Sequence, residues 1–172
     1  MKVFLNRGEL KSWRICLGSK ASKTVLATGV FDILHLGHVR FLEESKKAGG
    51  PNAKLLVVVA RDRTVIRRKG KTPVLPEEQR RRIVSSLKPV DQAVLGHEHL
   101  DFLGVLREYK PDIVSFGHDQ QDIKKAVEKI IKKERQPIRV VSIRRYGMRG
   151  LDSSTTVKKQ VARSMTRTGQ SR

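Results

Sequence analysis

From Thr24 onward, short apolar runs rich in β-branched residues alternate with longer stretches in which apolar residues recur at helical spacing. The short runs predict β-strands at residues 24–29, 54–60, 91–96, 112–117 and 138–143. The stretches between them predict helices at 36–48, 76–87 and 121–135 and a last helix that begins near Asp152, whereas residues 61–75 are predicted to form a basic loop. The run KLLVVVA is continuously apolar, which is typical of a central parallel strand covered on both faces. The alternation predicts an α/β fold, a single domain built on a doubly wound five-stranded parallel sheet.

Polar, small and basic residues gather after the predicted strands. In doubly wound sheets, ligands bind beyond the carboxyl ends of the strands, at the point where the strand order reverses. Backbone N–H groups at helix N-termini, hydroxyls and cations are the usual ligands of a polyphosphate. The residues of this kind that follow the first, second, fourth and fifth strands are Val30, Phe31, Asp32, His35, Leu36, Gly37, His38, Lys69, Lys71, Asp119, Arg145, Tyr146, Ser153 and Ser154.

Two histidines stand at the predicted start of the first helix. His35 and His38 are separated by Leu36 and Gly37, so both side chains can face a ligand, and the glycine lets the backbone approach a phosphate. Imidazole can stabilise charge that grows on a phosphate, whereas the chain shows no Ser or Cys beside a base for nucleophilic catalysis. A histidine pair also serves as a helix cap or a satisfied polar contact, so this spacing alone leaves both interpretations open.

The length and composition exclude several classes of protein. A chain of 172 residues suits one domain, and no apolar run approaches the roughly 18 residues that span a bilayer. The single cysteine, Cys16, excludes an internal disulfide and a Cys-rich zinc site, and the first 14 residues show no apolar leader core. We therefore expect a soluble, cytoplasmic protein.

The charge is large, and half of its excess lies in the two flanks. The formal net charge is +20, and a surface this basic attracts polyanions such as nucleic acid, anionic membrane or phosphorylated small molecules. A basic extension at residues 1–23 and a basic tail at residues 158–172 flank the predicted domain at 24–157. Such flanks are usually solvated, so they do not by themselves choose among these partners.

Two motifs carry a resemblance to a known family. GVFDILHLGH resembles the first signature of the nucleotidyltransferase superfamily, which has a Rossmann-like fold, and DSSTTVKK resembles its second phosphate-binding signature. The segments VARDRTVIRRKGKTPVLPEEQRRRIVSSLKPVDQAVLG and KPDIVSFGHDQ are similar to archaeal FAD synthases. Over about residues 24–157, the resemblance implies transfer of AMP from ATP to FMN, which yields FAD and pyrophosphate.

The resemblance also implies roles for individual residues. His35, His38 and Lys71 are the implied catalytic residues, the histidines acting on the transferring α-phosphate. The implied nucleotide-binding positions, which include this histidine pair, are Val30, Phe31, Leu36, Gly37, Asp119, Tyr146, Ser153 and Ser154. The implied phosphate- and acceptor-binding positions, which include Lys71, are Asp32, Lys69, Arg80, Lys88 and Arg145.

Two other functions stay open at the level of sequence. A cytidylyltransferase that forms a CDP-alcohol from CTP and a phospho-alcohol such as glycerol 3-phosphate shares the same signatures. A non-catalytic nucleic-acid-binding protein on this fold would account for the charge, but the resemblance favours small-molecule substrates, without nucleic acid or membrane as a partner. Related enzymes are often dimers, so a homodimer also stays open.

The metal expectation follows from the triphosphate. We expect a divalent ion such as Mg²⁺ to bind with ATP, held mainly by phosphate oxygens and water, because Asp32 and Asp119 are the few acids near the site. Its protein ligands are not assigned. The sequence His97-Glu98-His99 has no third ligand at usable spacing, so we do not expect a metal there.

Overall fold

The computed structural model describes residues 22–144 and 154–168. Its elements, in chain order, are β1 (Thr24–Gly29), α1 (Leu36–Ala48), β2 (Lys54–Val59), α2 (Asp62–Lys69), α3 (Glu77–Ser85), β3 (Gln92–Leu95), α4 (Phe102–Tyr109), β4 (Ile113–Gly117), α5 (Gln121–Lys133), β5 (Arg139–Ile143) and α6 (Ser154–Thr168). Every neighbouring strand pair is parallel, in the order β3-β2-β1-β4-β5. The predicted doubly wound parallel sheet is therefore confirmed, and its strand order reverses between β1 and β4.

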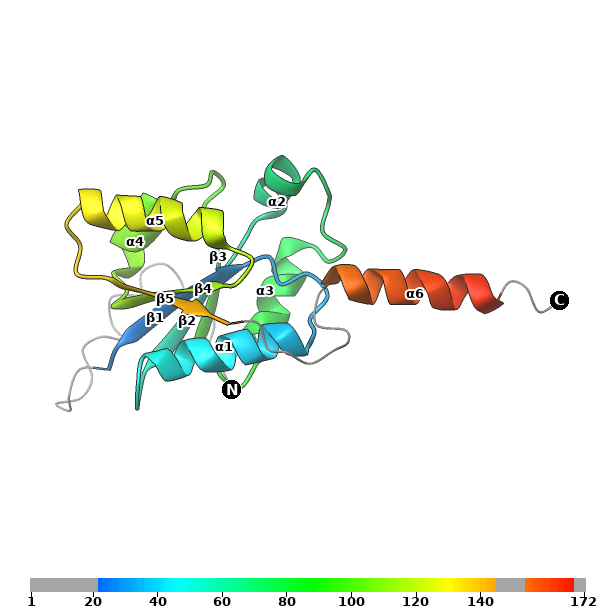
Figure 1. Cartoon of the computed structure of the whole chain (residues 1–172), viewed down its shortest axis with the longest axis horizontal. Coiled ribbons are helices and arrows are strands. Elements are labelled where there is room, and N and C mark those ends of the chain that lie inside the picture. Colours follow the sequence, from blue (N-terminus) through cyan, green and yellow to red (C-terminus); the bar gives the residue numbers. More distant parts are fainter. Residues whose placement is uncertain (1–21, 145–153, 169–172) are drawn as a thin grey trace.

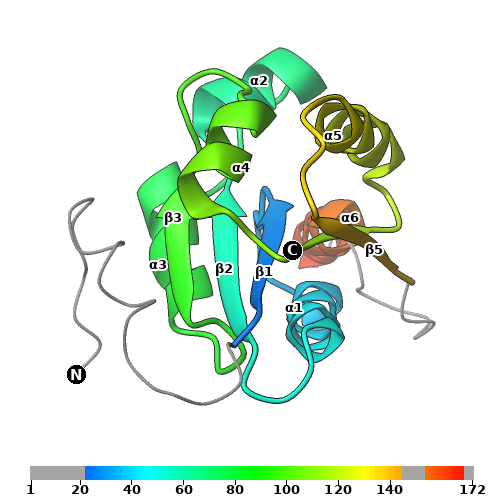
Figure 2. The same cartoon turned by 90° about the vertical axis from the view of Figure 1, so that its left-hand side faces the viewer.

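The sheet is covered on both faces, which explains the uninterrupted apolar run in β2. Side chains that alternate along a strand point to opposite faces, so Leu55 and Val57 join one cluster with Leu42 of α1 and Val84 of α3. Leu56 and Val58 of the same strand join the second cluster, beneath α4 and α5. Figure 1 shows α4 and α5 on one side of the sheet and α1 and α3 on the other, and Figure 2 shows β1, β2 and β3 side by side.

The predicted basic loop at 61–75 is wrong for most of its length, because residues 62–69 form α2. Asp62 stands in the first turn of this helix and basic residues occupy its last turn, an arrangement that the helix dipole favours. Gly70 ends the helix in the left-handed conformation, with φ of 62°. Val65 is the buried residue of α2, so the helix shows too little apolar periodicity to be recognised from sequence.

The last helix departs from the rest of the fold. α6 begins at Ser154 and runs across residue 157, where the sequence placed the end of the domain. In Figure 1 its far end extends well beyond the sheet, while its first turns lie beside the segment that follows β1. None of the helices in the described part of the chain is long and apolar enough to cross a membrane.

Candidate active site

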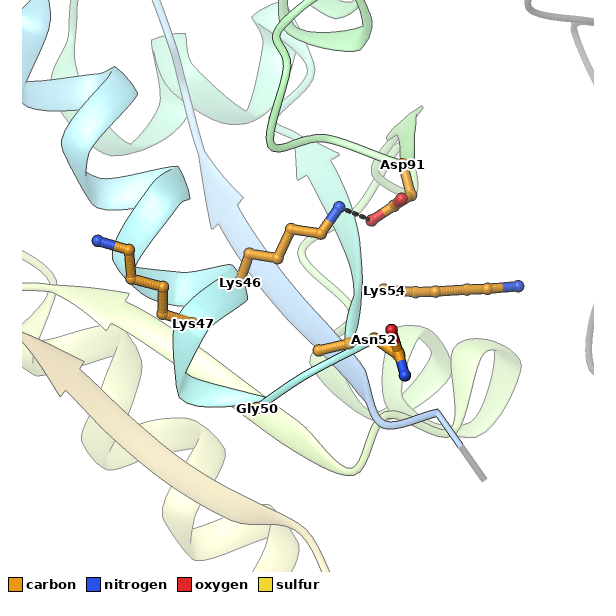
Figure 3. Close-up of a pocket in the computed structure, with 7 residues that line it drawn as sticks. Lys46, Lys47, Gly50, Asn52, Lys54 and Asp91 are labelled. Carbon is orange, nitrogen blue, oxygen red and sulfur yellow. Dashed lines mark hydrogen bonds and ion pairs between the residues drawn. The ribbon is translucent and has the colours of Figure 1, made fainter. Parts of the chain in front are cut away.

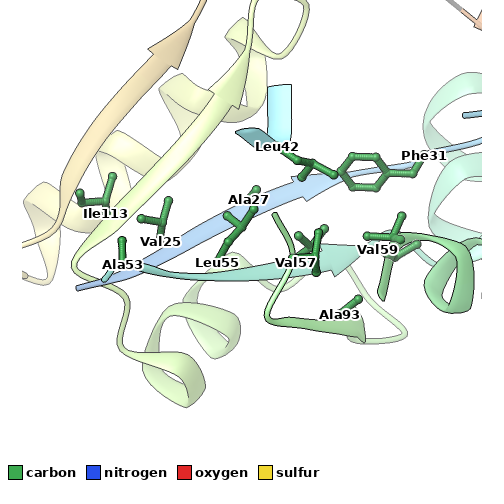
Figure 4. Packing of buried hydrophobic residues seen from close by; sticks show 12 residues of the cluster. Val25, Ala27, Phe31, Leu42, Ala53, Leu55, Val57, Val59, Ala93 and Ile113 are labelled. Atoms are coloured by element: carbon green, nitrogen blue, oxygen red, sulfur yellow. The ribbon is translucent and has the colours of Figure 1, made fainter. Parts of the chain in front are cut away.

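Gly29 ends β1 at a point where the ring of Phe31 leaves no room for a side chain. A Cβ at Gly29 would lie 2.7 Å from Cε2 of Phe31, a distance that real Cβ contacts do not allow. Phe31 is 2% exposed and packs in the core beside Leu42, as Figure 4 shows. The turn after β1 is thus anchored by a buried side chain while its backbone remains at the carboxyl edge of the sheet.

The two histidines stack at the start of α1. The His35 and His38 ring centroids are 3.9 Å apart with an interplanar angle of 25°, and the Phe31 ring lies 5.3 Å from that of His38. His35 is the N-cap residue with an extended backbone, and its side chain makes no capping hydrogen bond. Helix geometry gives the N–H groups of Leu36 and Gly37 no intrahelical partner, so this turn presents donors beside the rings.

His38 is held in its neutral form by its surroundings. Burial, followed by the charge of His35, lowers its pKa to about 4, against opposing contributions from Asp119 and Asp32 and a further lowering by Lys69. Within the described residues, its buried Nδ1 has no hydrogen-bond partner. The charges that act on this imidazole come from segments after β1, β2 and β4, so these three segments lie near one another at the carboxyl edge of the sheet.

Gln120 bridges the two strands that flank the reversal of strand order. Its Oε1 accepts a hydrogen bond from the N–H of Gly117 at 2.9 Å, and its Nε2 donates to the carbonyl of Thr28 at 2.9 Å. A Cβ at Gly117 would lie 2.9 Å from Oδ1 of Asp119, so the glycine lets this carboxylate turn back over the strand end. Gln120 is not among the predicted site residues, although its place beside Asp119 at a strand end is the signal for it.

The N-terminal end of α6 contacts the segment that follows β1. Oγ of Ser154 donates to the carbonyl of Asp32 at 2.5 Å, and Nζ of Lys158 forms an ion pair with Oδ2 of Asp32 at 2.9 Å. The sequence analysis placed Ser154 at the site but assigned Lys158 to a solvated tail. Lys158 lies four residues after Ser154, and that spacing puts both side chains on one face of a helix.

Arg80 is buried, so the expectation that it binds a substrate phosphate is wrong. Its side chain is 0% exposed, and Nη2 forms an ion pair with Oδ1 of Asp62 at 2.6 Å. The guanidinium also donates to the carbonyl oxygens of Val30, Ala60 and Leu75. Arg80 thus ties the ends of β1 and β2 to the segment before α3.

Lys88 lies at the opposite edge of the sheet, so its expected acceptor-binding role is also wrong. It precedes β3, and a segment that leads into a parallel strand lies at the amino edge of the sheet. The neighbouring Asp91 donates its N–H to the carbonyl of Leu55 near the start of β2, which fixes this position.

The remaining predicted residues divide into two groups. Lys69 is the last residue of α2 and Lys71 follows Gly70, and both lysines are exposed. Arg145, Tyr146 and Ser153 lie outside the described residues.

A hollow of about 420 Å³ lies at the amino edge, away from the histidines. In Figure 3, Lys46 reaches across it to Asp91, with the ion pair at 2.8 Å, while Lys47 and Lys54 extend in different directions. These ammonium groups do not converge on a common point. We therefore place the active site at the carboxyl edge, where the histidines, the cations and the helix starts meet.

The side chains at the carboxyl edge of the sheet show whether the protein could supply the ligands of a divalent metal ion. The part of the chain that the structure describes holds no group of three or more His, Cys, Asp or Glu side chains that could bind a metal ion. Asp32 is already bonded to Lys158, and Asp119 is exposed. This donor set fits an ion carried mainly by phosphate oxygens and water, with a single carboxylate at its side.

A parallel sheet with a stacked histidine pair at a helix start beside its reversal point is typical of a nucleotidyltransferase. A family model described as cytidylyltransferase-like matches residues 26–160. A solved structure of Thermoplasma volcanium, described as the lipopolysaccharide core biosynthesis protein, superposes with a TM-score of 0.61 at 43% identity, over 72% of this chain and 98% of that one. The pantothenate synthetase of Thermus thermophilus shares the fold at 15% identity, with a TM-score of 0.55, over 84% of this chain and 62% of that one.

Two curated relatives show to which branch of this family the chain is similar. The chain is 52% identical to the FAD synthase of Methanopyrus kandleri over 81% of its own length and 91% of that protein. It is 48% identical to the FAD synthase of Archaeoglobus profundus, over 80% and 84% of the two chains. The chain therefore belongs to the cytidylyltransferase-like family, in the branch whose curated archaeal members are named FAD synthase, and the resemblance inferred from its motifs is confirmed.

Proposed function

We propose that this nucleotidyltransferase moves AMP from ATP to FMN, which forms FAD and releases pyrophosphate. The observation that carries the proposal is the stacked His35 and His38 pair at the point where the strand order reverses. The names of the curated relatives supply the acceptor and the base, which the geometry of the site does not choose.

The reaction needs no covalent intermediate on the enzyme. A phosphate oxygen of FMN attacks the α-phosphorus of ATP, a new P–O bond forms in line, and the bond to the β-phosphate oxygen breaks to release pyrophosphate. The FMN phosphate is already ionised at neutral pH, so positioning and charge neutralisation supply most of the catalysis. A general base is therefore not required of this site.

His38 acts on the charge that develops at the α-phosphate. As a neutral imidazole it keeps one N–H to donate, and its low pKa means that it reaches this state without competing protonation at pH 7. The N–H groups of Leu36 and Gly37 add donors with the positive end of the helix dipole behind them. Lys69, Lys71 and Lys158 supply cations for the remaining phosphate oxygens.

A divalent metal ion would neutralise the triphosphate when it binds, as Mg²⁺ does for other phosphoryl donors. We propose Asp119 as its nearest carboxylate from this chain, with phosphate oxygens as the other ligands. Arg145, Tyr146 and Ser153 stay proposed contacts to the acceptor, the nucleotide and the triphosphate.

A product assay tests the proposal. The purified chain is incubated with Mg²⁺ and each pair of ATP or CTP with FMN or glycerol 3-phosphate, and the products are separated by chromatography. FAD and pyrophosphate in equal amounts from ATP and FMN, formed at least about 100-fold more slowly by His38→Ala, support it. A CDP-alcohol from CTP without any FAD would reassign the acceptor and the base, and salt-sensitive RNA binding without transfer would reassign the protein to nucleic acid.

We also propose a cytoplasmic location, because ATP and FMN are multiply charged and cross a bilayer only at a large desolvation cost. A homodimer stays a prediction, which analytical ultracentrifugation tests.

A further inference from the structure

Asp32 sits between two residues with unfavourable backbone conformations. Phe31 has φ of 54° and Ile33 has φ of 48°, in the left-handed region that side chains other than Gly, Asn and Asp rarely adopt. Such a residue destabilises the fold and persists only where the surroundings hold it in place. The turn that leads to the histidines is therefore held by contacts from elsewhere in the chain.

Asp32 makes several of these contacts itself. Its side chain is 9% exposed, and Oδ1 accepts hydrogen bonds from the N–H groups of Val74 at 3.0 Å and Leu75 at 3.1 Å. Oδ2 accepts from Nζ of Lys158 at 2.9 Å, and the backbone carbonyl accepts from Oγ of Ser154. One residue thus joins the turn after β1, the segment before α3 and the start of α6.

The carboxylate is held in its charged form by these bonds. Burial by itself raises the pKa of Asp32, but the hydrogen bonds from Lys158, Leu75 and Val74 outweigh burial and keep this pKa below its usual range. A negative charge with three donors around it is already satisfied. A metal ion or a phosphate would have to displace one of these partners.

Arg80 holds the same segment from the other side. Its Nε donates to the carbonyl of Leu75 at 2.9 Å, while Asp32 accepts from the N–H of that residue. Leu75 is therefore bonded at both of its backbone polar groups. The segment continues from Lys69 and Lys71, so these bonds set where the lysines stand relative to the histidine turn.

We propose that Asp32 is a positioning residue, which clamps the segment after Lys71 and the start of α6 to the histidine turn, and not a ligand of metal or substrate. The proposal corrects the sequence-based assignment of Asp32 to the acceptor or the metal, and its catalytic consequence rests on the function proposed above. Because cations from two distant segments must meet one triphosphate, a misplacement of about 1 Å is expected to cost about 100-fold in rate.

Three variants separate the two roles. Asp32→Asn keeps an oxygen for the N–H groups of Val74 and Leu75 but loses the charge opposite Lys158, whereas Asp32→Ala loses both contacts. Asp112→Asn is the matched control, because Oδ2 of Asp112 accepts from the N–H of Thr24 at 2.7 Å at the opposite edge of the sheet. Amide hydrogen exchange, followed by NMR, reports the clamp without any need for activity.

If Asp32 is a clamp, Asp32→Ala speeds amide hydrogen exchange at Val74 and Leu75 by at least about tenfold beyond its effect on global stability. Asp32→Asn changes the exchange rate of these two amides by less than about threefold. FAD formation falls about 100-fold with Asp32→Ala and less with Asp32→Asn, while the Mg²⁺ concentration for half-maximal rate moves less than twofold. Asp112→Asn changes neither quantity.

Unchanged exchange at Val74 and Leu75 in Asp32→Ala overturns the clamp. A rise of tenfold or more in the Mg²⁺ requirement of Asp32→Asn, with exchange unchanged, assigns Asp32 to the metal instead. If Asp32→Ala does not fold, the single variants Lys158→Met and Asp32→Asn are compared with the double variant that carries both changes. A clamp predicts that the double variant loses no more activity than the more severely affected single variant. Absence of FAD with the unaltered chain would overturn the proposed function, while the exchange result still judges the clamp.

Discussion

Two turns at the carboxyl edge of the sheet carry histidines, and they differ in what those histidines bond. In the turn after β3, His97 bonds Oδ2 of Asp101 at 3.2 Å and Oε2 of Glu108 at 2.8 Å, and the hydrogen bond that it donates to Glu108 is the main cause that raises its pKa. After the turn that follows β1, on the first helical turn of α1, His38 is half-buried against a second imidazole and an aromatic ring, and its pKa is lowered.

The difference separates a structural histidine from one that is prepared for a ligand. Protein carboxylates satisfy His97 and fasten α4 to the end of β3. His38 has an Nδ1 atom that the protein encloses without a hydrogen-bond partner among the described residues, next to a turn in which Phe31 and Ile33 have strained backbones. Both features cost stability, and such features cluster at functional sites, so they indicate a functional role for this histidine.

The largest effect should come from His38 itself. His38→Ala is expected to lower the rate of FAD formation by about 10² to 10³, because one donor to the developing phosphate charge is lost. Steady-state kinetics with ATP and FMN measure it, and circular dichroism checks that the fold is kept. His97→Ala is the matched control, and the contrast between the two turns breaks if this control loses as much turnover as His38→Ala.

A smaller effect on FAD formation is expected from the loss of Gln120, whose side chain joins the ends of β1 and β4. Gln120→Ala leaves the N–H of Gly117 and the carbonyl of Thr28 without a partner, which should cost about 1–3 kcal/mol for each group that stays buried. Both the free energy of unfolding in urea and FAD formation should fall. Asp101→Ala, which removes the cap on the N–H of Gly104, should cost about 1 kcal/mol of stability and leave turnover unchanged.

The smallest effects should appear in the pH dependence of stability, with opposite signs for the two histidines. The raised pKa of His97 gives stability that is complete below about pH 6.5 and is lost as the pH rises through the folded-state value. The lowered pKa of His38 makes stability fall as the pH decreases from about 6.5 to about 4. Urea unfolding of His97→Gln above about pH 6.5 and of His38→Gln between about pH 4 and 6.5 measures the two slopes, and slopes of the same sign would refute the assignment.

The sequence predicted the site turn well because its determinants are local. The histidines, the glycine between them and the helix start lie within four consecutive positions, and β1 and β4 are mainly apolar runs whose ends mark the edge of the sheet. Because the family resemblance rests on contiguous motifs, each of these positions can be matched to the family residue by residue.

The errors arose where a role depends on contacts far along the chain. Arg80 resembles a surface cation in sequence, but its guanidinium reaches Val30 across 50 residues and is buried there. Lys88 matches a recurrent basic position of the family, but chain direction in a parallel sheet puts it at the amino edge, away from the histidines. Lys158 stands inside the motif DSSTTVKK but one residue after the predicted end of the domain, and its ion pair with Asp32 is visible only once α6 is placed against the turn after β1.

The most direct test of the contrast is an NMR titration of the imidazole signals with Mg²⁺ and ATP, in the absence of FMN so that no turnover occurs. The signals of His35 and His38 should shift as ATP binds, while those of His97 should stay unchanged. Shifts confined to His97, with His35 and His38 unmoved at saturating ATP, would contradict the placement of the active site in the turn after β1.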